Sequence, residues 1–297
     1  MHLALKKEVE EKARGHFILN TQTDKVNFWK SKHLDLMACL RASYVNHAFS
    51  KHAHREFAIG VIEDGVEGFY YKGEIQFARK NNLVIINPEE VHTGYPANTC
   101  GYTYRMIYPE KKLIEEILGI EHTAKNHLFF KKVLISDPEI VYLFLDLHYT
   151  LEYSDSELEQ KEKFIRFFSM LLQGFAEKSW NHVKESTLPQ QRIQRVKDYI
   201  HECYDEDITL STLARISGLS EFQFSRTFSK QCGISPHVYL SQIRMEKAKK
   251  LLDNGITIAE VAVAVGFVDQ SHFSRRFKKI FGITPGQYVA ASKDVQY

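Results

Sequence analysis

The pattern of apolar and polar positions changes once along the chain. Over residues 15–108, short stretches either alternate apolar and polar residues, as in HLDLMACL, or form apolar runs that stop at turn residues, as in NNLVIINPEEVH. Short strands separated by turns are typical of a β-barrel or sandwich. From Pro109 onward the apolar positions recur at helical spacing. We therefore expect an α+β protein with two domains, a sheet-rich one followed by an all-α one.

One long helical stretch, SELEQKEKFIRFFSMLLQGFAEKSW, precedes the junction between the two parts. Its apolar residues recur at steps of three, four and seven and form a stripe that either packs on the barrel or meets a second copy of the chain: Leu158, Ile165, Phe168, Leu172 and Phe175. The polar stretch NHVKESTLPQQ follows. It predicts a first domain over residues 1–180, a linker at 181–191 and a second domain over 192–297.

The second domain repeats itself. The segment FSRTFSKQCGISPHVY at 224–239 returns as FSRRFKKIFGITPGQY at 273–288. Upstream, the two copies align at an offset of 48 residues through Gly218 and Gly266, and at 49 from Phe224 and Phe273 onward. The extra residue falls in a turn, where insertions are tolerated, so the pattern indicates a structural duplication.

Each copy has the sequence pattern of a helix-turn-helix motif. A threonine caps the first helix, a glycine ends it, and a short polar residue caps the second helix; these residues are Thr209, Gly218 and Ser220 in one copy and Thr257, Gly266 and Asp269 in the other. The motifs are predicted at about 208–229 and 256–279. In such motifs the second helix lies in the DNA major groove.

The segment between the copies predicts one helix over residues 236–253. Eighteen helical residues span about 27 Å. A rigid helix of that length could hold two recognition helices about 34 Å apart, which is about one turn of DNA. One chain would then read two successive major grooves.

Charge and composition add modest support. The net charge of the 297 residues is +2, but from Leu188 onward 15 Lys and Arg stand against 11 Asp and Glu, a net +4, and residues 1–187 carry −2. A basic excess in the duplicated half suits a nucleic-acid partner, and a solvated surface explains it equally well. The chain shows no leader segment and no apolar run of about 18 residues, so we expect a cytoplasmic protein without membrane contact. Four scattered cysteines predict reduced thiols: Cys39, Cys100, Cys203 and Cys232.

The closing segment GFVDQSHFSRRFKKIFGITPGQY at 266–288, the linker segment RMEKAKKLL and the two motifs together resemble the DNA-binding domain of the AraC/XylS family of bacterial transcription regulators. The N-terminal half, with HAHREFAIGVIEDG and LVIINPEEVHTGYP, resembles the cupin-like sensor domain common in that family. The resemblance implies a cupin-like β-barrel with helices, followed by an all-α tandem helix-turn-helix domain. It further implies an activator, not an enzyme, that binds operator DNA as a homodimer, responds to a small-molecule effector and recruits RNA polymerase.

Carried over by position, the resemblance turns a set of side chains toward DNA. They are Glu221, Phe222, Ser225 and Arg226 from the first recognition helix, and Gln270, Ser271, His272 and Arg275 from the second. Arg276 and Lys279 are expected on phosphates, and Phe224 and Phe228 in the core. Gln and Arg suit adenine and guanine edges. The alternative for Arg226 and Arg275 is contact with phosphate alone.

In the N-terminal half, His52, His54 and His92 could converge inside a small barrel. A metal-binding cupin also needs a glutamate a few residues past the second histidine, and Glu56 comes too early, so we expect no metal and no cofactor. The histidines are instead expected to line an effector pocket with Tyr104, with ordinary core histidines as the alternative. Arg105 meets a ligand carboxylate, a protein carboxylate or water, since a buried unpaired arginine is costly.

Two other functions remain open at this point. One is a metal-dependent cupin enzyme fused to a DNA-binding domain. The other is a regulator without a ligand, whose barrel only dimerises. A fused repair methyltransferase would need a reactive cysteine, and MACLRA around Cys39 and NTCGY around Cys100 do not provide a suitable setting.

Overall fold

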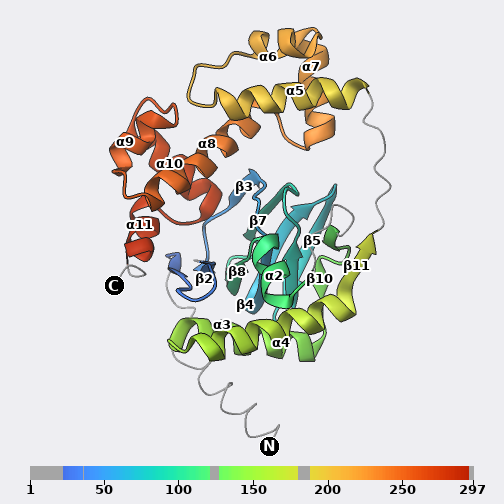
Figure 1. Ribbon diagram of the computed structural model, residues 1–297, viewed down its shortest axis with the longest axis vertical. Helices are drawn as coiled ribbons and strands as arrows, with labels where there is room; N and C mark the ends of the chain where they lie inside the picture. Colours follow the sequence, from blue (N-terminus) through green and yellow to red (C-terminus); the bar gives the residue numbers. More distant parts are fainter. Residues whose placement is uncertain (1–22, 36, 121–126, 180–187, 294–297) are drawn as a thin grey trace, which may run out of the picture.

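The computed structural model describes residues 23–35, 37–120, 127–179 and 188–293. It has a sheet-rich N-terminal part and a C-terminal part made of helices alone, which confirms the predicted fold class (Figure 1). Most of the predicted linker, namely residues 181–187, lies outside the described residues, and the first C-terminal helix begins at Leu188.

The strands of the N-terminal part form one nine-stranded sheet that runs in the order β1-β2-β8-β4-β6-β10, with β3, β5 and β7 attached beside this path. Their bounds are β1 Lys25–Lys30, β2 Ala38–Tyr44, β3 Phe49–His52, β4 Ala58–Tyr71, β5 Glu74–Arg79, β6 Leu83–Ile86, β7 His92–Pro96, β8 Tyr102–Tyr108 and β10 Leu134–Ile135. A second small sheet pairs β9 (His127–Phe130) with β11 (Ala176–Ser179).

The long strand β4 closes the sheet into a barrel. Its residues 58–61 pair with β6, whereas residues 66–71 pair with β5. The bend between these halves falls at Gly65, where φ is 75° and an added Cβ atom would lie 2.2 Å from the carbonyl oxygen of Gly101. Only glycine fits there, so this residue allows one strand to serve both sides of the barrel.

Three helices cover the outer face of the sheet: α2 (Lys111–Leu118), α3 (Pro138–Tyr153) and α4 (Glu157–Phe175). The helix in the last of these segments is confirmed, but the predicted stripe is only partly right. Phe168 is buried with Phe164 and Phe167, whereas Leu158 is 79% exposed and Ile165 is 42% exposed. The face that packs on α3 is therefore rotated from the predicted one, because the aromatic residues fill the space beside the sheet.

The C-terminal part contains seven helices among the described residues: α5 Leu188–Glu202, α6 Leu210–Ser217, α7 Glu221–Cys232, α8 Pro236–Asp253, α9 Ile258–Ala264, α10 Gln270–Phe281 and α11 Pro285–Lys293. The pairs α6–α7 and α9–α10 lie toward the two ends of α8 (Figure 1). Helix α8 has the predicted bounds.

The predicted helix ends are confirmed. Ser220 forms a capping box with Gln223, and Thr257 forms one with Glu260. The Thr209 and Asp269 side chains accept from the third amide of their helices. Two glycines take the left-handed conformation after the first helix of each motif: Gly218 with φ 66° and Gly266 with φ 75°.

Buried side chains link the two parts. One apolar cluster lies wholly within α5 to α8 and holds Phe224 and Phe228. Another begins inside the barrel with residues such as Leu40 and Tyr104 and continues into Phe277 and Ile280 of α10. The second helix-turn-helix unit is therefore docked on the barrel, with α11 on β1 and α10 on β3.

Candidate functional site

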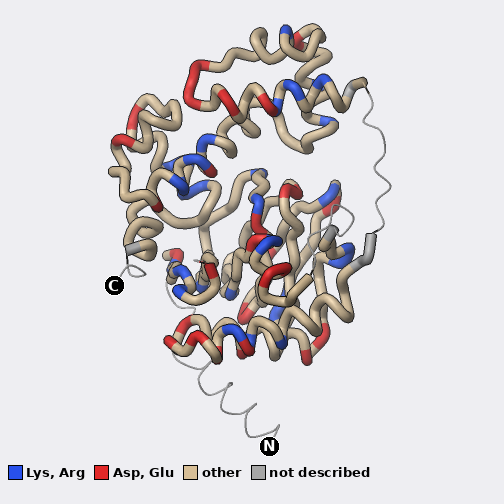
Figure 2. Tube along the Cα trace, in the orientation of Figure 1, with Lys and Arg blue, Asp and Glu red and all other residues tan. Residues whose placement is uncertain are grey.

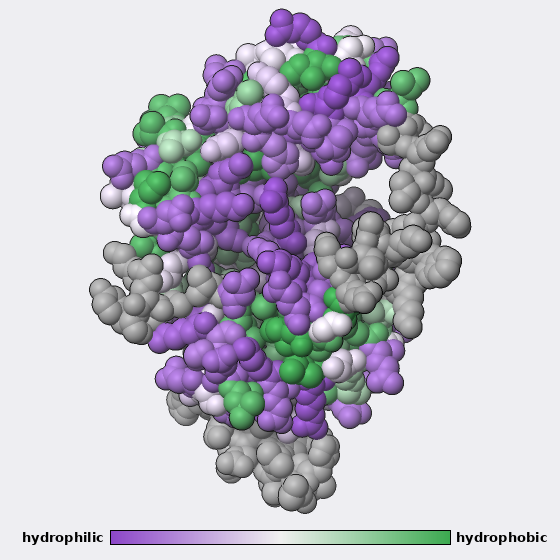
Figure 3. Space-filling model, in the orientation of Figure 1, coloured by the Kyte–Doolittle hydropathy of each residue, from purple (hydrophilic) through white to green (hydrophobic). Residues whose placement is uncertain are grey.

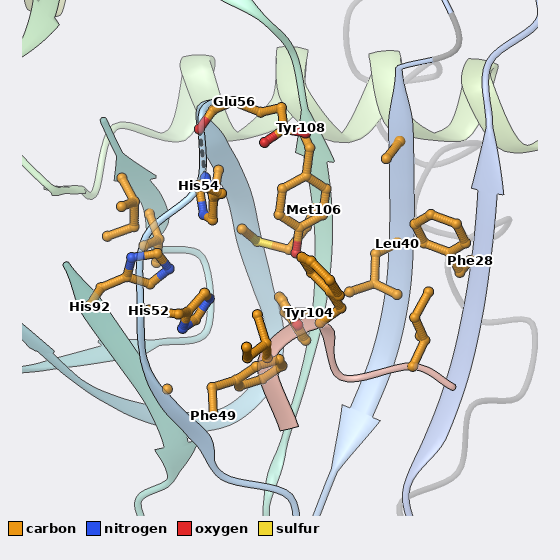
Figure 4. A pocket seen from close by; sticks show the side chains of 18 of the residues that line it. Phe28, Leu40, Phe49, His52, His54, Glu56, His92, Tyr104, Met106 and Tyr108 are labelled. Carbon is orange, nitrogen blue, oxygen red and sulfur yellow. Dashed lines mark hydrogen bonds between the residues drawn. The ribbon is translucent and has the colours of Figure 1, made fainter. Parts of the chain in front are cut away.

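A cavity of about 100 Å³ lies at the mouth of the barrel. One water occupies only about 10–15 Å³ of such space, so there is room for a small molecule. Apolar side chains, including Leu40, Phe49 and Met106, form much of its wall, while His52, His54 and His92 gather at one side (Figure 4). Few polar groups on a mainly apolar wall are typical of a ligand site.

The strand pairing brings the three predicted histidines together. His52 ends β3 and lies directly opposite His92, which begins β7, and the two ring centroids are 4.2 Å apart. His54 follows two residues after β3, and its ring centroid lies 4.9 Å from that of His92. One nitrogen from each ring lies within 4.8 Å of the other two.

Each of the three rings is oriented by a backbone carbonyl. The Nδ1 atom lies 2.8 Å from the oxygen of Ser50 for His52, 2.6 Å from that of Glu56 for His54, and 2.9 Å from that of Glu90 for His92. A carbonyl oxygen can only accept, so Nδ1 carries the proton in all three rings. The Nε2 atoms are consequently acceptors, and that of His54 is buried without a hydrogen-bond partner among the described residues.

Burial keeps these histidines neutral. It lowers the pKa of His52 to about 3, with the neighbouring His54 lowering it further. The pKa of His54 is also lowered by burial, against the opposing charge of Glu56. Burial holds the pKa of His92 well below the usual range, and His52 and His54 add to this effect. Neutral imidazole rings are the form that binds ligands or metals through a lone pair.

The cavity wall also contains a carboxyl group that the sequence analysis missed. Glu67 of β4 lines the cavity, as do Tyr104 and Tyr108 of β8. Burial raises the pKa of Glu67 to about 8, and the nearby Tyr102 side chain opposes that rise. Glu67 lies two and four residues before the buried Phe69 and Tyr71 on β4. Residues at this spacing face the same side of a strand, so the sequence could have placed Glu67 inside the barrel.

Glu67 should make stability depend on pH. The folded chain holds this proton more tightly than the unfolded chain, whose ordinary carboxyl value is 4.5, so stability is lost as pH rises from about 4.5 to about 8. The loss is at most ~1.4 kcal/mol per pH unit. Glu67→Gln should flatten this part of the curve in thermal melts between pH 5 and 9, and Glu74→Gln, at an exposed position of β5, should not. Parallel curves for wild type and Glu67→Gln would contradict the assignment.

Arg105 requires a correction: it does not line the cavity. Successive residues of a strand face opposite sides, so Tyr104 points inward and Arg105 points out toward α3. There its Nε atom lies 2.8 Å from Glu63 and its Nη1 atom 2.5 Å from Glu152. The protein carboxylate, one of the three partners considered for Arg105, is the one found, and the residue leaves the candidate ligand set.

The C-terminal domain supplies another wall of the cavity. Its contribution consists of Lys249 from α8 and Ile280, Phe281, Ile283 and Tyr288 from α10 to α11. Lys249 Nζ lies 2.8 Å from Glu56 Oε1 across the domain interface, and Lys30 Nζ lies 2.5 Å from Asp253 Oδ1 nearby. Burial would raise the pKa of Glu56, but Lys249 lowers it to about 2. No sequence signal identified these residues, because the docking of two domains leaves no periodicity.

The candidate DNA-reading residues lie on α7 and α10. Most are exposed, namely Glu221, Phe222, Arg226, Gln270, Ser271, His272, Arg275 and Lys279, whereas Ser225 is half-buried. Phe222 is 75% exposed, which is unusual for so large an apolar side chain. Figure 2 shows Lys and Arg along α5 and around α8 and α10.

Arg276 differs from the rest of this set. It is half-buried, and its Nε atom donates to Ser241 Oγ of α8 over 2.8 Å. Burial also lowers the pKa of its guanidinium. This arginine fixes α10 on the linker helix, so only the unbonded end of its guanidinium could reach a phosphate.

Comparisons with known proteins identify both parts of the chain. The AraC-like ligand binding domain matches residues 36–168, and a helix-turn-helix domain matches residues 213–291. The chain is 29% identical over 226 residues to YbfI, an uncharacterized HTH-type transcriptional regulator of Bacillus subtilis (strain 168), covering 75% of this chain and 81% of YbfI. It is 25% identical to the Msm operon regulatory protein of Streptococcus mutans, covering 69% and 74%.

The arrangement of the domains also has a counterpart among solved structures. The apo form of a lysine-to-alanine variant of ToxT from Vibrio cholerae strain SCE256 superimposes with a TM-score of 0.51 at 15% identity, covering 92% of this chain and 98% of that one. At this identity the likeness concerns the fold alone. Within the described ranges, no helix has the length and apolar character needed to cross a membrane.

Proposed function

We propose that a small molecule in the barrel cavity controls how the tandem helix-turn-helix domain of this AraC-type transcriptional regulator engages DNA. The observation that carries this proposal is that residues of both domains line the cavity. His52, His54, His92 and Tyr104 contribute from the barrel, and Lys249 and its neighbours contribute from the DNA-binding domain. A ligand that fills the cavity therefore contacts both domains, and its differential affinity for docked and undocked states sets their balance.

The base-reading part of this proposal rests on exposure and helix position. Gln270, Ser271 and His272 occupy the exposed N-terminal turn of α10, and Arg275 follows one turn later. Glu221, Phe222 and Arg226 have the corresponding places on α7, and Ser225 lies between them on the same helix. We assign base contacts to the two arginines and Gln270, and phosphate contacts to Lys279 and Arg276.

We also propose a homodimer that forms through α3 and α4. Tyr153 is 68% exposed, Leu158 is 79% exposed and Ile165 is 42% exposed on these helices. They are the exposed large apolar side chains of the described residues of α3 and α4. A strictly monomeric chain in sedimentation at micromolar concentration would exclude this dimer.

Activation through RNA polymerase requires a surface apart from the recognition helices. Val263 at the end of α9 is 70% exposed and Val268 in the following turn is 93% exposed. Figure 3 shows a hydrophobic area over this part of the molecule. We propose this surface as the polymerase contact of a cytoplasmic activator. Transcription in vitro that Val268→Asp leaves unchanged would refute it.

The enzyme alternative receives little support. A repair methyltransferase needs an activated thiolate, whereas burial holds the pKa of the Cys39 thiol well above its usual value and also raises that of Cys232. Cys100 is exposed on a turn. A cavity closed by a DNA-binding domain suits a control ligand better than a turnover substrate, so we propose that the chain is not an enzyme.

Two measurements test the proposed function. Selection from a random duplex pool should enrich one asymmetric site, because both motifs lie in one chain. A small molecule that raises the melting temperature should then change the affinity for that site by roughly 5- to 150-fold. Failure to enrich any duplex would remove the DNA function. A ligand that stabilises the chain but leaves DNA affinity unchanged would favour a barrel that only dimerises.

A further inference from the structure

We propose that His52, His54 and His92 form a binding site for a first-row divalent cation of the Zn²⁺ type, whose fourth ligand position opens into the barrel cavity. The sequence analysis expected no metal because Glu56 was badly placed for a carboxylate ligand. In the structure Glu56 pairs with Lys249 and is not part of the cluster that the three histidines form. The three histidines nevertheless converge without it.

The hydrogen bonds of the three rings leave their other nitrogens as acceptors, which a cation can bind. All three Nδ1–H groups are held by backbone carbonyls, so none of the three Nε2 atoms carries a proton that it could donate to a neighbour. The Nε2 atom of His54 is buried without a hydrogen-bond partner among the described residues, and a cation beside it would satisfy its lone pair. A carbonyl on Nδ1 is also the arrangement that fixes and orients metal-bound histidines.

The distances suit a tetrahedral ion after small movements. The nitrogens lie within 4.8 Å of one another, whereas bonds of 2.0–2.1 Å to Zn²⁺ place neighbouring ligands about 3.4 Å apart. The χ2 torsion of histidine has a broad energy well, so rotation of the rings can close the remaining gap of about 1.4 Å. Neutral imidazoles favour Zn²⁺ and its neighbours over Ca²⁺ or Mg²⁺, which prefer oxygen ligands.

The charge of the site predicts what occupies the fourth position. Three neutral rings leave the full charge of the ion, and among the described residues the Glu56 carboxylate is paired with Lys249. An anionic donor that enters the cavity would therefore bind the ion directly. The idea that the effector binds directly to the ion rests on the proposed function. The metal site itself does not depend on that function.

Cobalt provides a direct test on the full chain. After removal of metals with a chelator, wild type should bind one Co²⁺ per chain and show the intense visible bands of tetrahedral coordination, and Zn²⁺ should displace it. Azide should alter these bands if the fourth position is open. Loss of one ligand in His92→Ala should weaken binding by at least roughly 100-fold, beyond the 10–100-fold typical of outer-shell changes. His237→Ala, at an exposed histidine of α8, should leave binding unchanged.

Each outcome decides the question. Absence of visible bands in wild type at millimolar Co²⁺ would overturn the site, as would equal losses in His92→Ala and His237→Ala. If His92→Ala fails to fold, His54→Asn makes the same comparison, since His54 lies outside the strand pairing. If the chain selects a DNA duplex but binds no metal, only this inference is wrong. If it binds metal but selects no duplex, only the proposed function is wrong.

Discussion

Replacing Arg105 by leucine is expected to lower the free energy of unfolding by about 3–5 kcal/mol, the largest effect on stability that we predict for one side chain. Arg105 is fully buried, and it binds Glu63 and Glu152 at once. Its Nη1 atom also lies 2.9 Å from His148 Nδ1, and its guanidinium stacks 4.1 Å from the centre of the Tyr149 ring. The substitution would leave Glu152 without its arginine in a poorly solvated place, while Glu63 would keep Arg41 at 3.2 Å, and it would loosen α3 from the sheet.

Denaturant melts of matched variants would check this effect. Arg166→Leu removes an exposed arginine from α4 and should cost less than about 0.5 kcal/mol. Adding Glu152→Gln to Arg105→Leu should recover part of the loss, because the uncompensated charge disappears, whereas Glu63 remains paired with Arg41. A loss in Arg105→Leu no larger than that in Arg166→Leu would show that the network contributes nothing.

The helix boundaries of the C-terminal domain could be predicted because local chemistry determines them. Ser220, Thr257 and Asp269 satisfy amides within their own helices, and Gly218 adopts a backbone conformation that few other residues tolerate. Such signals need only four or five neighbouring residues. A duplicated segment shows them twice, which made the second motif as clear as the first.

Features that depend on contacts between residues far apart in the sequence were harder to predict. Leu158 and Phe168 both count as apolar in a helical pattern, but the aromatic residues of α4 fill the space beside the sheet and leave Leu158 exposed. The strand period did contain the answer for Arg105, because Tyr104 and Arg105 cannot face one cavity. The wall that Lys249 contributes could not be predicted, since it depends on how two folded domains dock.

Removing both candidate base-reading arginines should abolish specific DNA binding. Arg226 on α7 and Arg275 on α10 are exposed and belong to motifs separated by α8, a helix of 18 residues that spans about 27 Å. Each alanine substitution is expected to weaken binding to the selected site by about 1–3 kcal/mol. Losses at sites this far apart add, so the double variant should lose about 2–6 kcal/mol.

The comparison between single and double variants tests whether one chain reads both grooves. Additive losses mean that α7 and α10 contact the same DNA molecule at the same time. A silent Arg226→Ala or Arg275→Ala would mean that only one motif engages DNA, and the long helix α8 would not act as a spacer. Non-specific duplex is the reference for each variant, because an arginine that touches phosphate alone lowers both affinities by the same factor. Arg215→Ala, on the exposed face of α6, supplies the matched control for loss of one positive charge outside the recognition helices, and it should leave the ratio of specific to non-specific affinity unchanged.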